Sequence, residues 1–113
     1  MAEWIEINSE VQFDNEVQHG SVITLFGSSS NMAWNMVRGP IQAFVSGPIP
    51  VPDFVRVLYV DKDKLPQIAQ KRNVTIVPTA RFLRNGKKMS ELTGNQVKPE
   101  NIQKLLDQAG QQV

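Results

Sequence analysis

Two nearly continuous apolar runs, at residues 22–26 and 54–60, most constrain how this 113-residue chain can fold. Such runs, rich in β-branched residues, are typical of strands that are buried on both faces. A helical pattern at residues 32–46 lies between them, which favours parallel pairing of the two strands through a helical crossover. The sequence therefore predicts an α/β fold, with a mixed sheet of four or five strands and helices on both faces.

The remaining segments complete a single domain over residues 1–113. Strands are expected at 4–7, 79–83 and 88–93, and the Asn85-Gly86 pair predicts a hairpin turn between the last two. A stiff connector is expected at 47–52, and a kink where Gly39-Pro40 interrupts the helix at 32–46. The other helices are expected at 10–18, 65–71 and 99–108. The apolar positions expected to face the core from the first two helices are Val11, Phe13 (or Asp14), Val17, Met36, Val37, Ile41, Phe44 and Val45.

Composition excludes several classes of function. Twelve basic residues face eleven acidic ones, for a net charge of +1, so neither a nucleic acid nor a membrane surface is expected as a partner. No run approaches the length of a membrane span, and the acidic beginning lacks the pattern of a secretory leader. We expect a cytoplasmic protein, or a nuclear one without a visible signal.

Cysteine is absent, and histidine occurs once, as His19. The chain therefore has no thiolate nucleophile, no disulfide and no cysteine ligands for zinc or iron–sulfur clusters. A lone histidine cannot build a metal site, so neither a metal nor a cofactor is expected. His19 follows a predicted helix and precedes Gly20, and we interpret it as a solvated residue.

Several strings, in this order, resemble the thioredoxin family over nearly the whole chain. The run at 22–26 resembles the central strand that leads to the thioredoxin active site, and the run ending at Asp61 resembles the next strand. The segment at 73–79 is similar to the one that carries the family's cis-proline. The turn at 84–87, the Gly94 position and the helix after Pro99 complete the resemblance, which implies a thioredoxin fold.

The active site departs from the family pattern. Thioredoxins carry Trp-Cys-Gly-Pro-Cys where this chain has Ser30-Asn31-Met32-Ala33-Trp34-Asn35, and no alignment yields a thiol. The family's buried acid corresponds to Leu25, and its neighbouring lysine corresponds to Val57. The resemblance therefore implies a redox-inactive member, because the nucleophile and both ionisable neighbours are missing.

A peptide-binding groove is the first candidate site. In the family, substrate polypeptide lies across the active-site loop, the residue before the cis-proline and a glycine of the last strand. The resemblance implies a cis Val77-Pro78 bond, with the Val77 backbone open to strand-like pairing. We predict an exposed Trp34 as a hot spot, although apolar residues at helical spacing also suit a core. The six candidate positions are Asn31, Met32, Trp34, Val77, Pro78 and Gly94.

Two other sites are weaker candidates. The serines at 28–30 could be proposed as nucleophiles. Each would need a base, but His19 is expected at the far end of a strand and no other base is apparent. The first amides of the helix near Met32 could bind an anion, although the phosphate-loop glycines and lysine are missing. Arg81, in a predicted internal strand, is expected to pair with Glu91 or to reach the sheet edge.

The function expected is non-catalytic. We predict a scaffold or assembly subunit that binds another protein, or an extended peptide, through the former active-site face. The alternative is an interaction module that uses another surface, with the groove vestigial. A thiol–disulfide enzyme is the third interpretation, by fold alone. The chain is expected to be a monomer, or a homodimer through the same face.

Overall fold

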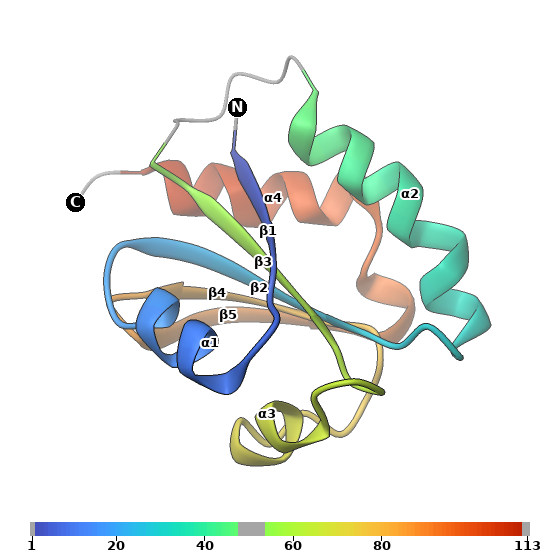
Figure 1. Cartoon of the computed structure of the whole chain (residues 1–113). Coiled ribbons are helices and arrows are strands. Elements are labelled where there is room, and N and C mark those ends of the chain that lie inside the picture. The colour runs from blue at the N-terminus through green and yellow to red at the C-terminus, as the bar shows by residue number, and fades with distance from the viewer. Residues whose placement is uncertain (1, 48–53, 112–113) are drawn as a thin grey trace.

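The computed structural model describes residues 2–47 and 54–111, which form one mixed sheet with helices on both sides (Figure 1). Five strands lie in the order β1-β3-β2-β4-β5. The first three are parallel, and β4 and β5 pair antiparallel. The strands are β1 (Glu3–Glu6), β2 (Ser21–Gly27), β3 (Arg56–Asp61), β4 (Thr79–Arg84) and β5 (Lys87–Thr93). The predicted fold class is thus confirmed, with the upper strand number.

The helices also follow the predicted order. They are α1 (Glu10–Val17), α2 (Met32–Ser46), α3 (Pro66–Lys71) and α4 (Pro99–Gly110), with a short 3-10 turn, η1 (Gly94–Gln96), after β5. Helix α2 runs through Pro40 as one element, and Gly39 before it has no Cβ to clash with the proline ring. The connector predicted at 47–52 falls almost entirely outside the described residues.

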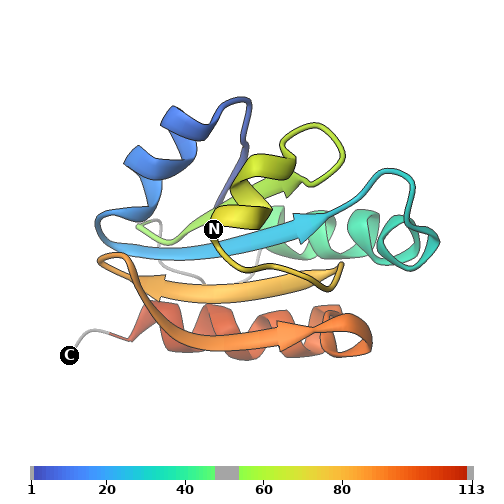
Figure 2. The ribbon, with the colours of Figure 1, turned by 90° about the horizontal axis from the view of Figure 1, so that it is seen from below.

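Successive side chains of the central strand β2 point to opposite faces of the sheet, and each face has its own apolar core. Ile23 and Leu25 point to the side covered by α2 and α4, where Ile102 and Leu106 meet them. Val22 and Phe26 belong to the other cluster, which α1 and α3 cover. Figure 2 shows the sheet between the helices from a second direction. The sheet is therefore buried on both faces at its centre, as the two apolar runs predict.

Two residues predicted to face the core are exposed instead. Val11 on α1 is 70% exposed, whereas Phe13 and Val17 of the same helix are buried. Met36 on α2 is 73% exposed, whereas Ile41 and Val45 are buried. These two predictions were wrong because each helix buries a residue two positions away, Phe13 on α1 and Trp34 on α2, and so turns Val11 and Met36 outward.

The hairpin turn and Arg81 behave as expected. Asn85 and Gly86 both have positive φ, at 51° and 85°, which the two central residues of this tight hairpin turn require. The Nε of Arg81 donates to Glu91 at 2.6 Å across the β4–β5 pair. The predicted pairing of Arg81 is thus confirmed.

Candidate functional site

The former active-site loop lies at the carboxyl ends of β2 and β3, where α2 begins. Asn31 is the N-cap of α2, and its side-chain oxygen accepts the backbone N–H of Trp34 at 2.9 Å. The Asn35 amide nitrogen donates back to the Ser29 carbonyl at 2.9 Å. The first backbone N–H groups of a helix have no partner within the helix, and Asn31 supplies one of these partners. Asn35 ties the same helical turn to the preceding loop.

The serines of this loop converge on one carboxylate, Asp63, from the loop after β3. The hydroxyls of Ser28 and Ser30 donate to Asp63 at 2.7 and 2.9 Å, and the Ser30 backbone N–H donates at 3.1 Å. Ser29 adds a longer contact of 3.4 Å. Sequence reasoning missed Asp63, because only the parallel pairing of β2 and β3 brings residues more than thirty positions apart together.

These hydrogen bonds hold the pKa of Asp63 below its usual value of 3.8, with the Ser28 hydroxyl as the largest cause. A carboxylate stabilised in its ionised form is a poor proton acceptor, so it gives the serines little activation. The same carboxylate accepts the backbone N–H of Ser30, so this donor is already used and is not open to an external anion. Both weaker candidates, serine catalysis and anion binding in this loop, lose support from this arrangement.

Trp34 is fully buried, with 0% exposure, so the prediction of an exposed indole was wrong. Its ring stacks on Tyr59 at 5.3 Å between centroids, and its Nε1–H donates to the Tyr59 hydroxyl at 3.1 Å. Gly27 makes the space, since a Cβ there would lie 2.3 Å from the indole. The indole therefore belongs to the core under α2 rather than to a partner-binding surface.

Tyr59 is the centre of an aromatic cluster on this side of the sheet. Trp4 stacks against it at 6.0 Å, and the Arg38 guanidinium lies 4.6 Å from its ring centroid. Arg38 in turn pairs with Glu6 at 3.2 Å. Burial raises the pKa of the Tyr59 phenol above 10.0, and the hydrogen bond from Trp34 opposes that shift.

The sites of the family's ionisable pair are apolar. Leu25 and Val57 are both fully buried in the cluster beneath α2. An apolar pair there avoids the desolvation cost that a buried acid and lysine would bring. The described part of the chain also holds no group of three or more His, Asp or Glu residues that could bind a metal ion.

A groove of about 380 Å³ opens between α2 and the loop before β4. The Val77–Pro78 peptide bond is cis, and the Pro78 carbonyl accepts the Gly94 N–H at 2.8 Å. Three of the six candidate residues, Val77, Pro78 and Gly94, line this groove. The residues that line it are Ala33, Met36, Val37, Val77, Pro78, Gly94, Asn95, Val97 and Lys98.

The other candidate residues flank the groove or lie beneath it. Met32 is 78% exposed on the first turn of α2, and Asn31 lines a neighbouring polar pocket that shares Val77. Met36, which sequence reasoning assigned to the core, instead lines the groove with its side chain largely exposed. Its position one helical turn after Met32 is the signal that could have identified it.

Several thioredoxins are among the solved structures that resemble this chain. The thioredoxin of Malassezia sympodialis (Mala s 13) is 28% identical, with a TM-score of 0.80, over 98% of this chain and 94% of that one. Thioredoxin O2 from Arabidopsis thaliana, in its oxidised state, is 21% identical, with a TM-score of 0.78, over 97% and 96% of the two chains. The second likeness, at this identity, bears on the fold alone.

The family itself is identified by a sequence model. No curated protein matches the chain. Among the described residues, no helix has the length and apolar character needed to cross a membrane. The Thioredoxin family model matches residues 41–108, which begin within α2 and include the cis-proline, the hairpin and most of α4. The chain therefore belongs to the thioredoxin family, as a member without the two cysteines of dithiol exchange.

Proposed function

We propose that this chain is a non-catalytic scaffold that binds an extended segment of another polypeptide in the groove beside Val77 and Pro78. The absence of cysteine removes dithiol exchange, and the role proposed for this face is non-covalent binding. The observation that carries the proposal is the open backbone of Val77 at the edge of an apolar groove.

Val77 has both of its backbone groups free within residues 2–47 and 54–111. Neither its N–H nor its carbonyl makes a hydrogen bond there, whereas the adjoining Pro78 carbonyl is taken by Gly94. A free donor and acceptor on one residue can pair with one residue of an extended strand, as in strand addition to a sheet edge. An extended polypeptide is therefore a better match for this backbone than a small molecule or a helix.

The groove supplies the contacts for alternate side chains of that segment. Val37, Val77 and Val97 line it, and an extended peptide presents every second side chain to the same surface. Met32 and Met36 are exposed beside it, and their flexible thioethers adapt to differently shaped partners. Lys98 is the one charged lining residue, which favours a segment with an acidic or polar residue at that end.

Selection from a random linear peptide library displayed on phage would test the proposal. Met36→Glu places a charge in the groove at an exposed position, so the variant should fold like the wild type. Val11→Glu is the matched control, because Val11 is an equally exposed apolar residue of a helix on the opposite side of the sheet. We expect peptides that bind wild type and Val11→Glu and that lose at least tenfold in affinity for Met36→Glu.

Three results would oppose the proposal. Failure to enrich any peptide would reject the groove as a peptide site. Peptides lost with Val11→Glu and kept with Met36→Glu would favour the alternative, an interaction module with another surface. A homodimer that Met36→Glu dissociates, seen by sedimentation velocity, would make a second copy the occupant. A cytoplasmic location is part of the proposal, and imaging of a tagged chain in its native cell would test it.

A further inference from the structure

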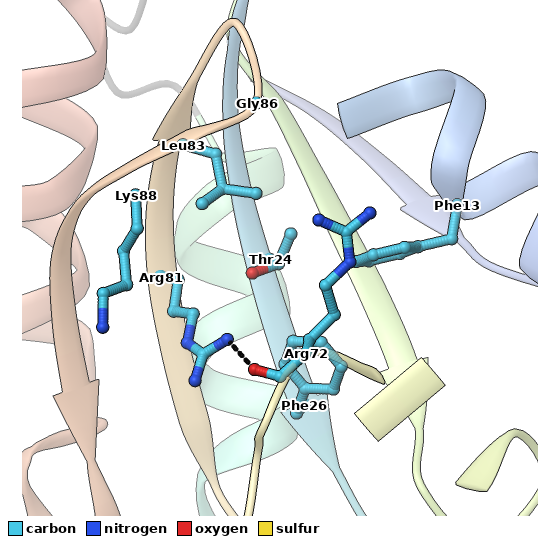
Figure 3. Close-up of a pocket in the computed structure, with 8 residues that line it drawn as sticks. All are labelled: Phe13, Thr24, Phe26, Arg72, Arg81, Leu83, Gly86 and Lys88. Atoms are coloured by element: carbon cyan, nitrogen blue, oxygen red, sulfur yellow. Dashed lines mark hydrogen bonds between the residues drawn. The ribbon is translucent and has the colours of Figure 1, made fainter. Parts of the chain in front are cut away.

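A second, smaller pocket lies on the other side of the sheet, on the side covered by α1 and α3 (Figure 3). Its volume is about 110 Å³, and no residue that lines it belongs to the groove. Its apolar walls are Phe13 from α1, Phe26 from β2 and Leu83 from β4. A space of this size suits a small ion or a few waters, and it is too small for a nucleotide or a peptide.

Three cationic side chains line this pocket: Arg72, Arg81 and Lys88. Arg81 is the most buried of them, with 13% of its side chain exposed. Two carboxylates are nearby, Glu91 beside Arg81 and Lys88, and Asp14 at 3.2 Å from Arg72. Three positive charges against two negative ones leave the surroundings of the pocket with one positive charge in excess.

Hydrogen-bond donors remain available after the internal contacts are made. The Arg81 guanidinium donates to Glu91, to the Arg72 carbonyl at 2.6 Å and to the Asn73 carbonyl at 3.4 Å. The Arg72 guanidinium donates to Asp14 and lies 5.0 Å from the centroid of the Phe13 ring. A guanidinium carries five N–H groups, so both arginines keep N–H groups for a ligand.

Thr24, at the centre of β2, supplies an independent indication. The residue is 1% exposed, and its hydroxyl oxygen has no hydrogen-bond partner. Figure 3 shows that hydroxyl on the pocket side of β2, between the two arginines. Because a buried hydroxyl without a partner is costly, something that accepts or donates a hydrogen bond is expected to occupy this space.

We propose that this pocket binds a small tetrahedral oxyanion such as inorganic phosphate. Thr24 donates its hydroxyl hydrogen to one oxygen, while Arg72, Arg81 and Lys88 supply charge and further donors. The apolar walls lower the local dielectric and strengthen these contacts relative to water. The site lies across the sheet from the peptide groove and does not depend on the function proposed there.

Titration of the ¹⁵N-labelled protein with inorganic phosphate, at constant ionic strength set by sodium chloride, tests this site. We expect saturable amide shifts centred on Thr24, Arg72 and Lys88, with millimolar affinity, and the same shifts with sulfate. Thr24→Val keeps the shape of the side chain and removes the donor, so phosphate affinity should fall about tenfold. The same variant should be at least as stable as the wild type, because it also removes the unpaired hydroxyl.

Two further variants locate the site. Lys88→Gln should weaken phosphate binding several-fold, whereas Lys87→Gln, on the same hairpin but outside the pocket lining, should leave it unchanged. Shifts that sodium chloride alone reproduces, or no saturation in the wild type, would overturn the proposal and leave water as the occupant. Equal phosphate affinity in Thr24→Val, Lys88→Gln and wild type would also overturn it, because the anion would then bind elsewhere.

Discussion

The Trp34 indole lies flat against the Tyr59 ring, with 20° between the two planes, and donates its N–H to the Tyr59 hydroxyl. This pair joins the first turns of α2 to the middle of β3. It also satisfies the one polar atom of an otherwise apolar, fully buried side chain. Trp34 therefore lies in the core under α2 and is not among the residues that line the groove.

Truncation of Trp34 should strongly destabilise the folded protein. Trp34→Ala removes the largest buried side chain, so the free energy of unfolding should fall by about 3–5 kcal/mol. Met32→Ala, two residues earlier and exposed, should stay within about 0.5 kcal/mol of wild type. Urea unfolding followed by circular dichroism measures both. Equal stability of the two variants would contradict the buried position of the indole.

The phenol of Tyr59 should titrate above 10.0 in the folded protein, because burial raises its pKa. Tyr59 is the only tyrosine, so absorbance at alkaline pH reports this residue alone. A raised pKa favours the protonated phenol, so its contribution to stability is complete below pH 10 and is lost as the pH rises through the folded pKa.

Trp34→Phe should raise the pKa of Tyr59 further, because it removes the N–H that stabilises the phenolate. Trp4→Phe is the matched control, since Trp4 stacks on Tyr59 without donating a hydrogen bond to it. A similar shift in both variants would assign the effect to packing instead of to the hydrogen bond.

Gly27 should tolerate no side chain. A Cβ there would lie 2.3–2.6 Å from three atoms of the indole, so Gly27→Ala should lower the free energy of unfolding by about 1–3 kcal/mol. Gly39→Ala provides the control, because no atom lies within 4 Å of its Cβ position apart from its chain neighbours and the backbone of its own helix. Alanine gains there in helix propensity and loses against the ring of Pro40, so a change within about 1 kcal/mol is expected. Thermal unfolding compares the two, and equal losses would contradict the contact.

Asp63 should give the loop a dependence on acidic pH. Its pKa in the folded protein lies below 3.8, so its contribution to stability is present above that value and is lost as the pH falls through the folded pKa. The difference in unfolding free energy between wild type and Asp63→Asn should therefore narrow at low pH. NMR titration of the carboxyl carbon measures the pKa directly, and Ser28→Ala should move it upward. A pKa unchanged by Ser28→Ala would contradict the assigned cause.

Local patterns predicted the fold because the features that determine it are local in the sequence. The run at 22–26 specifies a doubly covered strand, and Asn85-Gly86 specifies the turn between β4 and β5. The face of each helix that turns toward the core was harder to predict from the sequence. Residues two positions apart on a helix point about 200° away from each other, so burial of Trp34 turns Met36 outward, and burial of Phe13 turns Val11 outward. All four side chains are apolar, so the pattern alone could not say which stripe is buried.

The site depended on contacts between distant segments, which sequence patterns do not encode. Trp34 could be placed in the core only by knowing that Gly27 faces it across the loop. The Asp63 contacts to Ser28 and Ser30 required the pairing of β2 with β3. The groove residues Val77, Pro78 and Gly94 were found because the resemblance, rather than any local pattern, joined them.

The contact between Ser28 and Asp63 also joins segments that are far apart in the sequence. Its two partners are 35 positions apart, and they meet only at the ends of two strands that are already paired in parallel. The Asn31 cap of α2, in contrast, joins groups only three positions apart in the sequence. The serine loop in front of α2 depends on β3 for its shape, because Asp63 follows that strand. A peptide cut from residues 20–46 would carry the helix and its cap, yet its loop would lack the acceptor that gives it shape.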